Sequence, residues 1–266
     1  MTVIDNADQE RRFGALRRLY GETAYRRLRA ARVAVVGLGG VGSWATEALA
    51  RCGVAALVLI DLDHVAESNI NRQVQAVGAT LGQAKALALS ERIADIHPGC
   101  AVSAVEEFVE PGNWPALLPH DVDAVIDACD QVRAKVALAA WALASSRGFV
   151  SVGAAGGKHQ AHAVDVADLS LVTHDPLLAA LRQRLRREQG AARQGRIGVR
   201  CVYSRETVAA PVADGEAKGA PAGAALSCHG YGSLVTVTAT FGMVAAGEVV
   251  AQLTAGTRQP YGPQAL

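Results

Sequence analysis

The sequence lacks several features that would narrow its function at once. None of its five cysteines belongs to a Cys-x-x-Cys pair, so we expect no zinc site. The opening residues, MTVIDNADQERRFGALRR, have no apolar central stretch of the kind found in a secretory signal. The odd cysteine count and this polar start favour a reducing cytoplasm. The net charge of +1 neither indicates nor excludes a nucleic-acid partner, so the distribution of charge must decide.

Aromatic residues are also scarce. They make up 5% of the chain, whereas 50% of the residues are hydrophobic, so aliphatic side chains must fill the core. A length of 266 residues suits one large α/β domain, and neither an internal repeat nor a clean boundary divides it. We therefore expect a single domain over 1–266, with a nucleotide-binding core at about 9–155 and a substrate-side extension at about 156–266.

One long stretch without charge tests whether the chain enters a membrane. Eighteen residues from Gly230 to Gly247 carry no charge, close to the length of about 20 residues that spans a bilayer. The stretch contains three threonines and four glycines, and Glu248 follows directly. We expect a buried core helix here, with a membrane anchor as the alternative.

The order of the elements predicts the fold class. Residues 9–31 are arginine-rich and helix-like, and from Arg32 onward apolar strands alternate with amphipathic segments. This alternation predicts a doubly wound, largely parallel, Rossmann-like α/β sheet, with ligands beyond the carboxyl ends of the strands. The expected strands are 32–36, 57–61, 100–106, 123–127, 149–153 and 163–172. The expected helices are 42–52, 79–96, 132–147 and a later one with Pro176 near its start; 206–225 is expected to be a flexible loop.

A glycine-rich loop follows the first expected strand. Gly37, Gly39 and Gly42 have the spacing G-x-G-x-x-G and open a helix, an arrangement that lets backbone N–H groups approach a phosphate. Asp61, at the end of the next strand, is placed where a carboxylate accepts hydrogen bonds from ribose hydroxyls. These residues alone serve NAD and ATP equally well.

The residues after Asp61 favour ATP. Arg72 can fork onto phosphate oxygens and Lys85 can supply a point charge, as departure of pyrophosphate requires. Asp130 follows the fourth strand, where a carboxylate can bind Mg²⁺. Each has an ordinary explanation as well: a surface arginine, a solvated helix lysine and a helix N-cap. Their joint position at one sheet edge favours the ATP site.

The motifs G-L-G-G-V-G-S, D-x-D-x-V-x-x-S-N-x-N-R-Q, G-x-x-K and D-x-x-D-x-x-x-x-K together resemble the E1-like (ThiF/MoeB-type) adenylating superfamily. The resemblance covers residues 9 to about 155. It implies that Asp61 holds ribose and that Asp130 organises Mg²⁺. The family's usual T-D-N is Cys129-Asp130-Gln131 here, which keeps the carboxylate. The implied ATP-binding and catalytic set is Gly37, Gly39, Gly40, Gly42, Asp61, Asp63, Asn69, Arg72, Gln73, Lys85 and Asp130.

Later segments resemble the tRNA threonylcarbamoyladenosine dehydratase branch of that superfamily. They are RRFGALRRLYGE, VIDACDQVRAKVAL, VDVADLSLVTHDPLLAALRQRLR and LSCHGYGSLVTVTATFG. The resemblance implies that the carboxylate on adenosine 37 of tRNA is adenylated and that intramolecular attack then closes a ring and expels AMP. ATP and Mg²⁺ are the implied cofactors, and a monovalent cation stays open.

The charge distribution fits an RNA substrate. Seven arginines and one acid lie between Arg182 and Arg200, and such a stripe supplies affinity for phosphates. A solvated helix face is the alternative. Cys228 is a candidate for lining the substrate site or, alternatively, for redox or thioester chemistry. The residues expected to contact tRNA are Lys158, Arg182, Arg184, Arg186 and Arg187.

The arginine-rich N-terminal segment predicts a homodimer with a shared active site. In the superfamily an N-terminal arginine reaches the ATP of the partner, and here Arg12 and Arg18 lie in the R-F-G and R-L-Y-G elements. We favour these two over Arg17. Such an arginine would neutralise charge on the γ-phosphate.

Three other functions remain open at this point. The first is an adenylyltransferase for a ubiquitin-like sulfur-carrier protein. The second is a non-catalytic nucleotide-binding scaffold in sulfur trafficking, docked to a sulfur-relay protein. An NAD oxidoreductase is the third.

Overall fold

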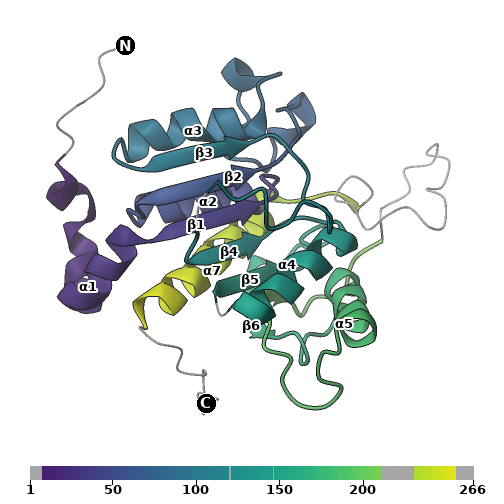
Figure 1. Ribbon diagram of the computed structural model, residues 1–266. Coiled ribbons are helices and arrows are strands. Elements are labelled where there is room, and N and C mark those ends of the chain that lie inside the picture. Colours follow the sequence, from purple (N-terminus) through teal and green to yellow (C-terminus); the bar gives the residue numbers. More distant parts are fainter. Residues whose placement is uncertain (1–7, 120, 146, 211–230, 256–266) are drawn as a thin grey trace.

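A seven-stranded sheet runs through the middle of the protein (Figure 1). The structure is a computed structural model and describes residues 8–119, 121–145, 147–210 and 231–255. The strand order is β3-β2-β1-β4-β5-β7-β6. The bounds are β1 (Arg32–Val36), β2 (Ala56–Ile60), β3 (Ala101–Val105), β4 (Ala124–Asp127), β5 (Gly148–Val152), β6 (Val164–Asp168) and β7 (Arg200–Ser204).

The pairing of the strands indicates where a ligand would bind. β1 pairs in parallel with β2 on one side, with Val33 opposite Leu57, and with β4 on the other, with Val33 opposite Ala124. The chain therefore runs outward in one direction through β2 and β3 and in the other through β4 and β5. Ligands in such sheets bind at this reversal of strand order, beyond the carboxyl ends of β1 and β4. β6 pairs antiparallel with β7 and forms an edge of the sheet.

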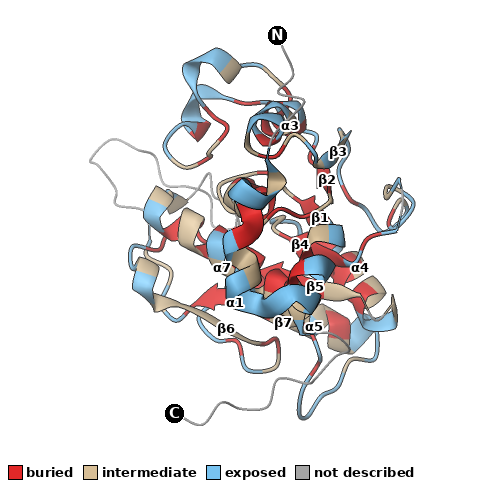
Figure 2. Ribbon diagram, turned by 90° about the vertical axis from the view of Figure 1, so that its left-hand side faces the viewer, coloured by how far each residue is buried: buried red, intermediate tan, exposed pale blue. Residues whose placement is uncertain are grey.

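Helices cover both faces of the sheet. Side chains of α2, α3 and α7 share one apolar cluster with the inward-facing residues of β1, β2, β4 and β5. Side chains of α4 and α5 share a second cluster with the opposite face. Buried residues, red in Figure 2, therefore concentrate on the strands and on the helix faces that meet them. The helices are α1 (Gln9–Ala30), α2 (Gly42–Arg51), α3 (Lys85–Ile96), α4 (Val132–Ser145), α5 (Pro176–Glu188) and α7 (Val235–Thr254).

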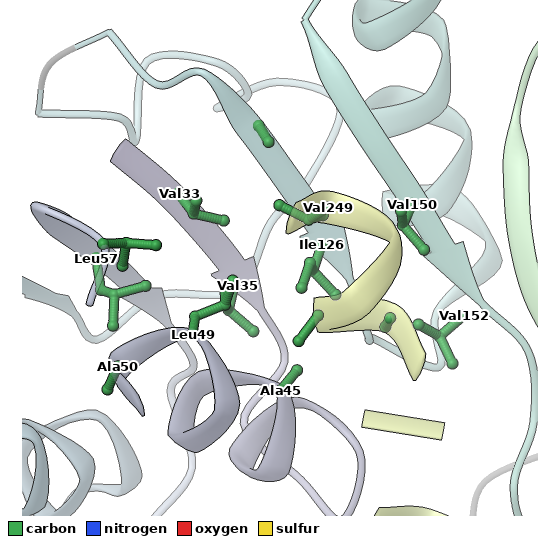
Figure 3. Packing of buried hydrophobic residues seen from close by; sticks show 14 of the residues in the cluster. Val33, Val35, Ala45, Leu49, Ala50, Leu57, Ile126, Val150, Val152 and Val249 are labelled. Carbon is green, nitrogen blue, oxygen red and sulfur yellow. The ribbon is translucent and has the colours of Figure 1, made fainter. Parts of the chain in front are cut away.

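α7 brings the end of the described chain back into the nucleotide-binding half. Its Val249 lies in the same cluster as Ile126 of β4 and Val150 of β5 (Figure 3). Gly242 permits the close approach of α2, because a Cβ there would lie 2.5 Å from the carbonyl oxygen of Val41. By length and composition, α7 is also the one helix of the described residues that could cross a membrane. Its buried face shows that it is built into the protein core.

α1 has two parts that meet at a kink. Asp8 caps its N-terminus by accepting a hydrogen bond from the Arg11 backbone N–H at 3.0 Å. Gly21 has φ +78°, a backbone conformation that glycine adopts without strain, and it interrupts the helical dihedrals. Beyond the kink, Tyr25 and Leu28 are buried against the body of the protein.

The expected fold class is confirmed, and the differences are local. The strands expected from residue 32 to 153 lie within one or two residues of β1 to β5. The helix expected from residue 79 begins at Lys85, because residues 78–80 form a separate 3₁₀ turn. The strand expected at 163–172 is the shorter β6, since a turn follows Asp168. β7 was not expected, and most of the predicted loop 206–225 lies outside the described residues.

Candidate active site

A cleft opens where the strand order reverses, at the carboxyl ends of β1, β2, β4 and β5. It encloses about 1090 Å³ of space, part of which is open to solvent. Residues from several segments far apart in the sequence meet there. Nine residues predicted to bind nucleotide line it: Gly37, Gly39, Gly40, Asp61, Asp63, Arg72, Gln73, Lys85 and Asp130.

The glycines of the loop after β1 are required by close backbone contacts. Gly37 has φ +84°, and a Cβ there would lie 2.9 Å from the backbone of Ala128 and Cys129. Gly42 does not line the cleft, but a Cβ there would collide with the carbonyl oxygen of Gly37. No side chain caps the N-terminus of α2 at Val41. The helix therefore presents backbone N–H groups and a positive dipole end to the cleft, as an anion-binding helix does.

Asp61 is held rigidly at the end of β2. Its Oδ2 accepts a hydrogen bond from the Leu38 N–H at 2.6 Å, and its Oδ1 accepts one from the Asp63 N–H at 2.8 Å. Burial raises the pKa of Asp61, and the nearby positive charge of Lys85 opposes that shift. A carboxylate fixed in this way between the glycine loop and the next strand can accept hydrogen bonds from a pair of ribose hydroxyls.

Two cationic side chains, those of Lys85 and Arg72, also line the cleft. Lys85 is the first residue of α3, and its Nζ donates to Asp63 Oδ2 at 2.7 Å. The Lys85 side chain is 7% exposed, whereas that of Asp63 is 56% exposed. Arg72 donates from one Nη to the Ser68 carbonyl oxygen at 2.7 Å and to Asn71 Oδ1 at 2.9 Å. Its other guanidinium nitrogens have no partner among the described residues and can bind phosphate oxygens.

Asn69 contributes by holding the backbone. It does not line the cleft, and its Oδ1 accepts a hydrogen bond from the Ala66 N–H at 3.0 Å. Its carbonyl oxygen accepts from the backbone N–H groups of Arg72 and Gln73 at 3.0 Å each. Asn69 therefore positions the turn that carries Arg72, and its contact with the triphosphate stays a prediction.

Asp130 is an exposed carboxylate of the cleft. It has no hydrogen-bond or ion-pair partner among the described residues, although it lines the cleft beside Cys129 and Gln131. The described residues hold no group of three or more His, Cys, Asp and Glu side chains that could bind a metal. A Mg²⁺ ion would therefore use Asp130 with phosphate oxygens and water, as Mg²⁺ in nucleotide sites commonly does. The residues present fit that arrangement.

A buried ion pair beneath the cleft escaped sequence reasoning. Asp127 and Lys135 are fully buried, and Lys135 Nζ lies 3.0 Å from Asp127 Oδ2. The Ser151 hydroxyl donates to Asp127 Oδ2 at 2.6 Å, and Lys135 donates to the Val152 carbonyl oxygen at 2.7 Å. Burial lowers the pKa of Lys135, but the Asp127 carboxylate outweighs burial and the pKa is raised.

This ion pair connects two segments that line the cleft. Asp127 Oδ1 accepts from the backbone N–H of Cys129 at 3.3 Å, directly before Asp130. Lys135 holds the end of β5, which leads into the cleft residues Gly153 and Ala154. The two residues occur in the motif D-x-x-D-x-x-x-x-K, so their spacing was visible. Their burial was not, because charged residues are usually exposed.

Lys158, predicted to contact tRNA, is buried in the structure. It is 2% exposed, and its Nζ donates to the carbonyl oxygens of His174, at 3.1 Å, and of Glu206. Burial lowers the pKa of Lys158, while Asp175 and Glu206 oppose that shift. The Lys158 ammonium therefore joins the segment before α5 to the segment after β7, and its contact with tRNA stays a prediction.

The predicted arginine stripe lies on α5 and the loop that follows it. Arg182 supports the preceding loop by donating to the carbonyl oxygens of Leu169 and Val172 at 3.0 and 2.8 Å. Arg184 forms a two-bond ion pair with Glu188 at 2.9 and 3.0 Å, and Arg187 also bonds Glu188. Arg186 and Arg187 line a hollow on the outer face of α5. The four arginines therefore differ in how free they are to bind a ligand.

The N-terminal arginines do not line the cleft. Arg12 donates to the carbonyl oxygens of Asp95 and Ile96 at 2.9 and 2.6 Å, at the end of α3 opposite to Lys85. Arg18 is exposed and has no partner among the described residues, and the neighbouring Leu19 is 72% exposed. Cys228 lies outside the described residues.

Fold and cleft together define the class of protein. A doubly wound sheet places an uncapped helix N-terminus, a buried and rigidly held carboxylate, two cations and a free carboxylate around one cleft, which is the construction of a nucleotide-binding α/β protein. The ThiF family profile matches residues 13–264, and the chain belongs to this family.

Individual relatives and solved structures show which members of the family this chain resembles. The chain is 41% identical over 262 residues to tRNA threonylcarbamoyladenosine dehydratase of Escherichia coli (strain K12), covering 96% of this chain and 98% of the relative. The crystal structure of the E. coli tRNA N6-threonylcarbamoyladenosine dehydratase in complex with ATP has a TM-score of 0.84 at 39% identity, covering 96% and 98% of the two chains. Molybdopterin-synthase adenylyltransferase of E. coli is 37% identical over 124 residues, covering 47% of this chain and 49% of that one.

Proposed function

We infer that the protein is an ATP-dependent tRNA threonylcarbamoyladenosine dehydratase. The observation that carries this inference is the cleft, whose nine predicted residues come together in a chain that matches such a dehydratase along nearly its whole length. The sulfur-carrier adenylyltransferase is the weaker alternative, because that relative matches less than half of the chain.

The reaction removes one water at the expense of ATP. The carboxylate of the threonylcarbamoyl group attacks the α-phosphorus, the bond to the bridging oxygen breaks, and pyrophosphate leaves. An atom of the same carbamoyl group then attacks the activated acyl carbon and expels AMP, and its proton passes to solvent. No protein nucleophile is needed, so the enzyme acts by positioning and by electrostatic stabilisation.

Different residues of the cleft bind the nucleotide and stabilise the charge that develops. The glycine loop and the N-terminus of α2 bind phosphates, and Asp61 accepts the ribose hydroxyls. Arg72 and Lys85 neutralise charge that develops on the departing pyrophosphate. Asp130 would hold Mg²⁺, which supplies further charge neutralisation when bound. Asp63 keeps the Lys85 ammonium in place through their 2.7 Å ion pair.

The direct test of the function uses tRNA that carries threonylcarbamoyladenosine. The protein, ATP and Mg²⁺ should convert this nucleoside to a product lighter by one water and release one AMP per conversion, measured by nucleoside mass spectrometry and AMP assay. A parallel reaction with a sulfur-carrier protein ending in Gly-Gly should release no pyrophosphate. Pyrophosphate release with the carrier alone would overturn the proposal in favour of the adenylyltransferase.

The active enzyme is a homodimer in the cytoplasm in which Arg18 acts across the subunit boundary. Arg18 is exposed beside the exposed Leu19 and the kink at Gly21, so it is available to a partner, whereas Arg12 already binds the end of α3 in its own chain. An arginine delivered from the partner can neutralise γ-phosphate charge.

Subunit mixing tests this arrangement. Inactive Asp130→Ala chains mixed with inactive Arg18→Ala chains should regain activity, because a mixed dimer contains one intact composite site. Subunit exchange is verified with differently tagged chains. Verified mixed dimers that stay inactive would place Arg18 outside the partner's site.

A further inference from the structure

The outer face of α5 carries a hollow formed by arginine side chains. It has no acidic lining residue, and the chain after α5 helps to build it. Its lining residues are Ala179, Arg182, Gln183, Arg186, Arg187 and Arg193. We propose that this hollow binds one backbone phosphate of the RNA substrate, and this proposal rests on the proposed function.

The loop after α5 brings Arg193 to the hollow. Gly190 has φ +65°, which reverses the chain direction directly after the helix. The Ala191 N–H then donates to the Leu185 carbonyl oxygen at 3.2 Å, and Arg186 Nε donates to the Ala192 carbonyl oxygen at 3.1 Å. The loop is thereby fixed against the helix, so Arg193 and Arg186 meet although they belong to different segments.

All four arginines keep unused donors, and Arg186 and Arg193 keep both of their Nη groups free within the described residues. Arg182 and Arg187 also line the hollow. Arg182 donates to two carbonyl oxygens and Arg187 donates to Glu188, so part of their hydrogen-bonding capacity is already used within the protein. Arg186 uses only its Nε within the described residues, and Arg193 is exposed and has no partner there. Each planar guanidinium can donate two parallel hydrogen bonds to one phosphate, which is the geometry that arginine recognises best.

The position of the hollow indicates which phosphate binds. Leu177, in the first turn of α5, lines the nucleotide cleft, and Arg186 lies nine residues further along the same helix. At 1.5 Å per residue the separation along the axis is about 13 Å. Successive phosphates of a stacked strand advance by about 3.4 Å along its axis, so a strand that runs parallel to α5 would bring a phosphate about four nucleotides from the reacting adenosine to the hollow. The occupant we propose is a phosphate of the strand that carries the reacting adenosine.

The test compares two single arginine removals that change the charge equally. Arg193→Ala removes a guanidinium from the hollow, and Arg26→Ala removes one that is paired with Glu22 on α1 and does not line the hollow. Binding of a stem-loop RNA carrying the modified adenosine is measured over a salt series. Arg193→Ala should weaken binding roughly tenfold, and the slope of log K against log salt should fall by about 0.7–0.9, which is the loss of one phosphate contact. Arg26→Ala should stay within about twofold of the unmodified protein, with an unchanged slope.

Uncharged linkages placed one at a time in the RNA backbone identify the phosphate that binds. Single methylphosphonate linkages are placed at successive positions of the RNA, and the one about four nucleotides from the adenosine should weaken binding to the unmodified protein but not to Arg193→Ala. Equal effects of Arg193→Ala and Arg26→Ala, with no linkage singled out, would overturn the phosphate site alone, provided that the unmodified protein dehydrates this RNA. A protein that neither binds nor dehydrates the RNA would overturn the proposed function as well.

Discussion

Replacing Lys135 by Met should show how much the stability of the protein depends on its buried ion pair. Lys135 and Asp127 are both fully buried and 3.0 Å apart, so the substitution leaves a carboxylate without its counter-ion in the core. Removal of one partner from such a pair costs about 3–5 kcal/mol. For a protein of this size, each kcal/mol lowers Tm by about 2–4 °C, so we expect Tm to fall by roughly 6–20 °C.

The same substitution should impair nucleotide binding before the protein unfolds. Asp127 also accepts a hydrogen bond from the Cys129 N–H, and Lys135 holds the Val152 carbonyl oxygen, so both segments of the cleft lose a support. ATP affinity, measured by titration calorimetry at a temperature where the variant is folded, should therefore fall. Stability is measured by urea unfolding followed by circular dichroism.

Two control variants make the reasoning falsifiable. Arg26→Met breaks an exposed i,i+4 pair with Glu22 and should cost no more than about 0.5 kcal/mol. The double variant Asp127→Asn/Lys135→Met removes the unpaired charge and should recover part of the loss. A cost for Lys135→Met as small as that of Arg26→Met, or strictly additive losses in the double variant, would refute the argument.

Three further predictions follow from other parts of the structure. Asp130→Asn should abolish AMP release with little change in urea unfolding, because Asp130 is exposed and unpaired among the described residues; near-normal turnover with Mg²⁺ would contradict its role. Burial, together with the charges of Arg29 and Arg12, lowers the pKa of His97 to about 4. The folded protein therefore binds fewer protons than the unfolded chain between about pH 6.5 and 4, so roughly 3 kcal/mol of stability, present above pH 6.5, should be lost as pH falls through this range. His97→Gln should flatten this part of the unfolding profile, and an unchanged profile would assign the acid loss to other groups. Gly242→Val should lower Tm, because a Cβ 2.5 Å from the Val41 carbonyl oxygen forces α2 and α7 apart, and a thermal melt equal to that of the unmodified protein would argue against close helix contact.

Elements with continuous apolar patterns were predictable from the sequence. β1, β2 and β4 are buried on both faces, as parallel strands between helices are, and their runs of Val, Leu and Ile reveal it. β7 was missed because its five residues, RCVYS, follow a loop rich in Gly and Arg and carry a short, mixed pattern. Its partner β6 is antiparallel, which alternation of strands and helices does not predict.

The cleft was predictable because the residues of the motifs follow the ends of the expected strands. Asp61, Arg72, Lys85 and Asp130 lie after strands or in the loops that follow them, so a parallel sheet brings them to one edge. Burial of polar groups was the part that sequence did not reveal. Lys158 lies in a loop of small residues, and only the tertiary structure shows that its ammonium is enclosed by carbonyl oxygens.

The placement of α7 has a consequence for how the protein is made. Phe241 and Val249 complete the same apolar cluster as Val33 and Val35, although most of the chain separates them. Contacts between such distant segments slow folding, because a long loop must close before they form. Synthesis proceeds at about 5–20 residues per second, so the first strands leave the ribosome roughly ten seconds or more before their covering helix does. During that interval the face of the sheet that α7 will cover stays open, and we expect chaperones that bind apolar strands to engage the nascent chain there.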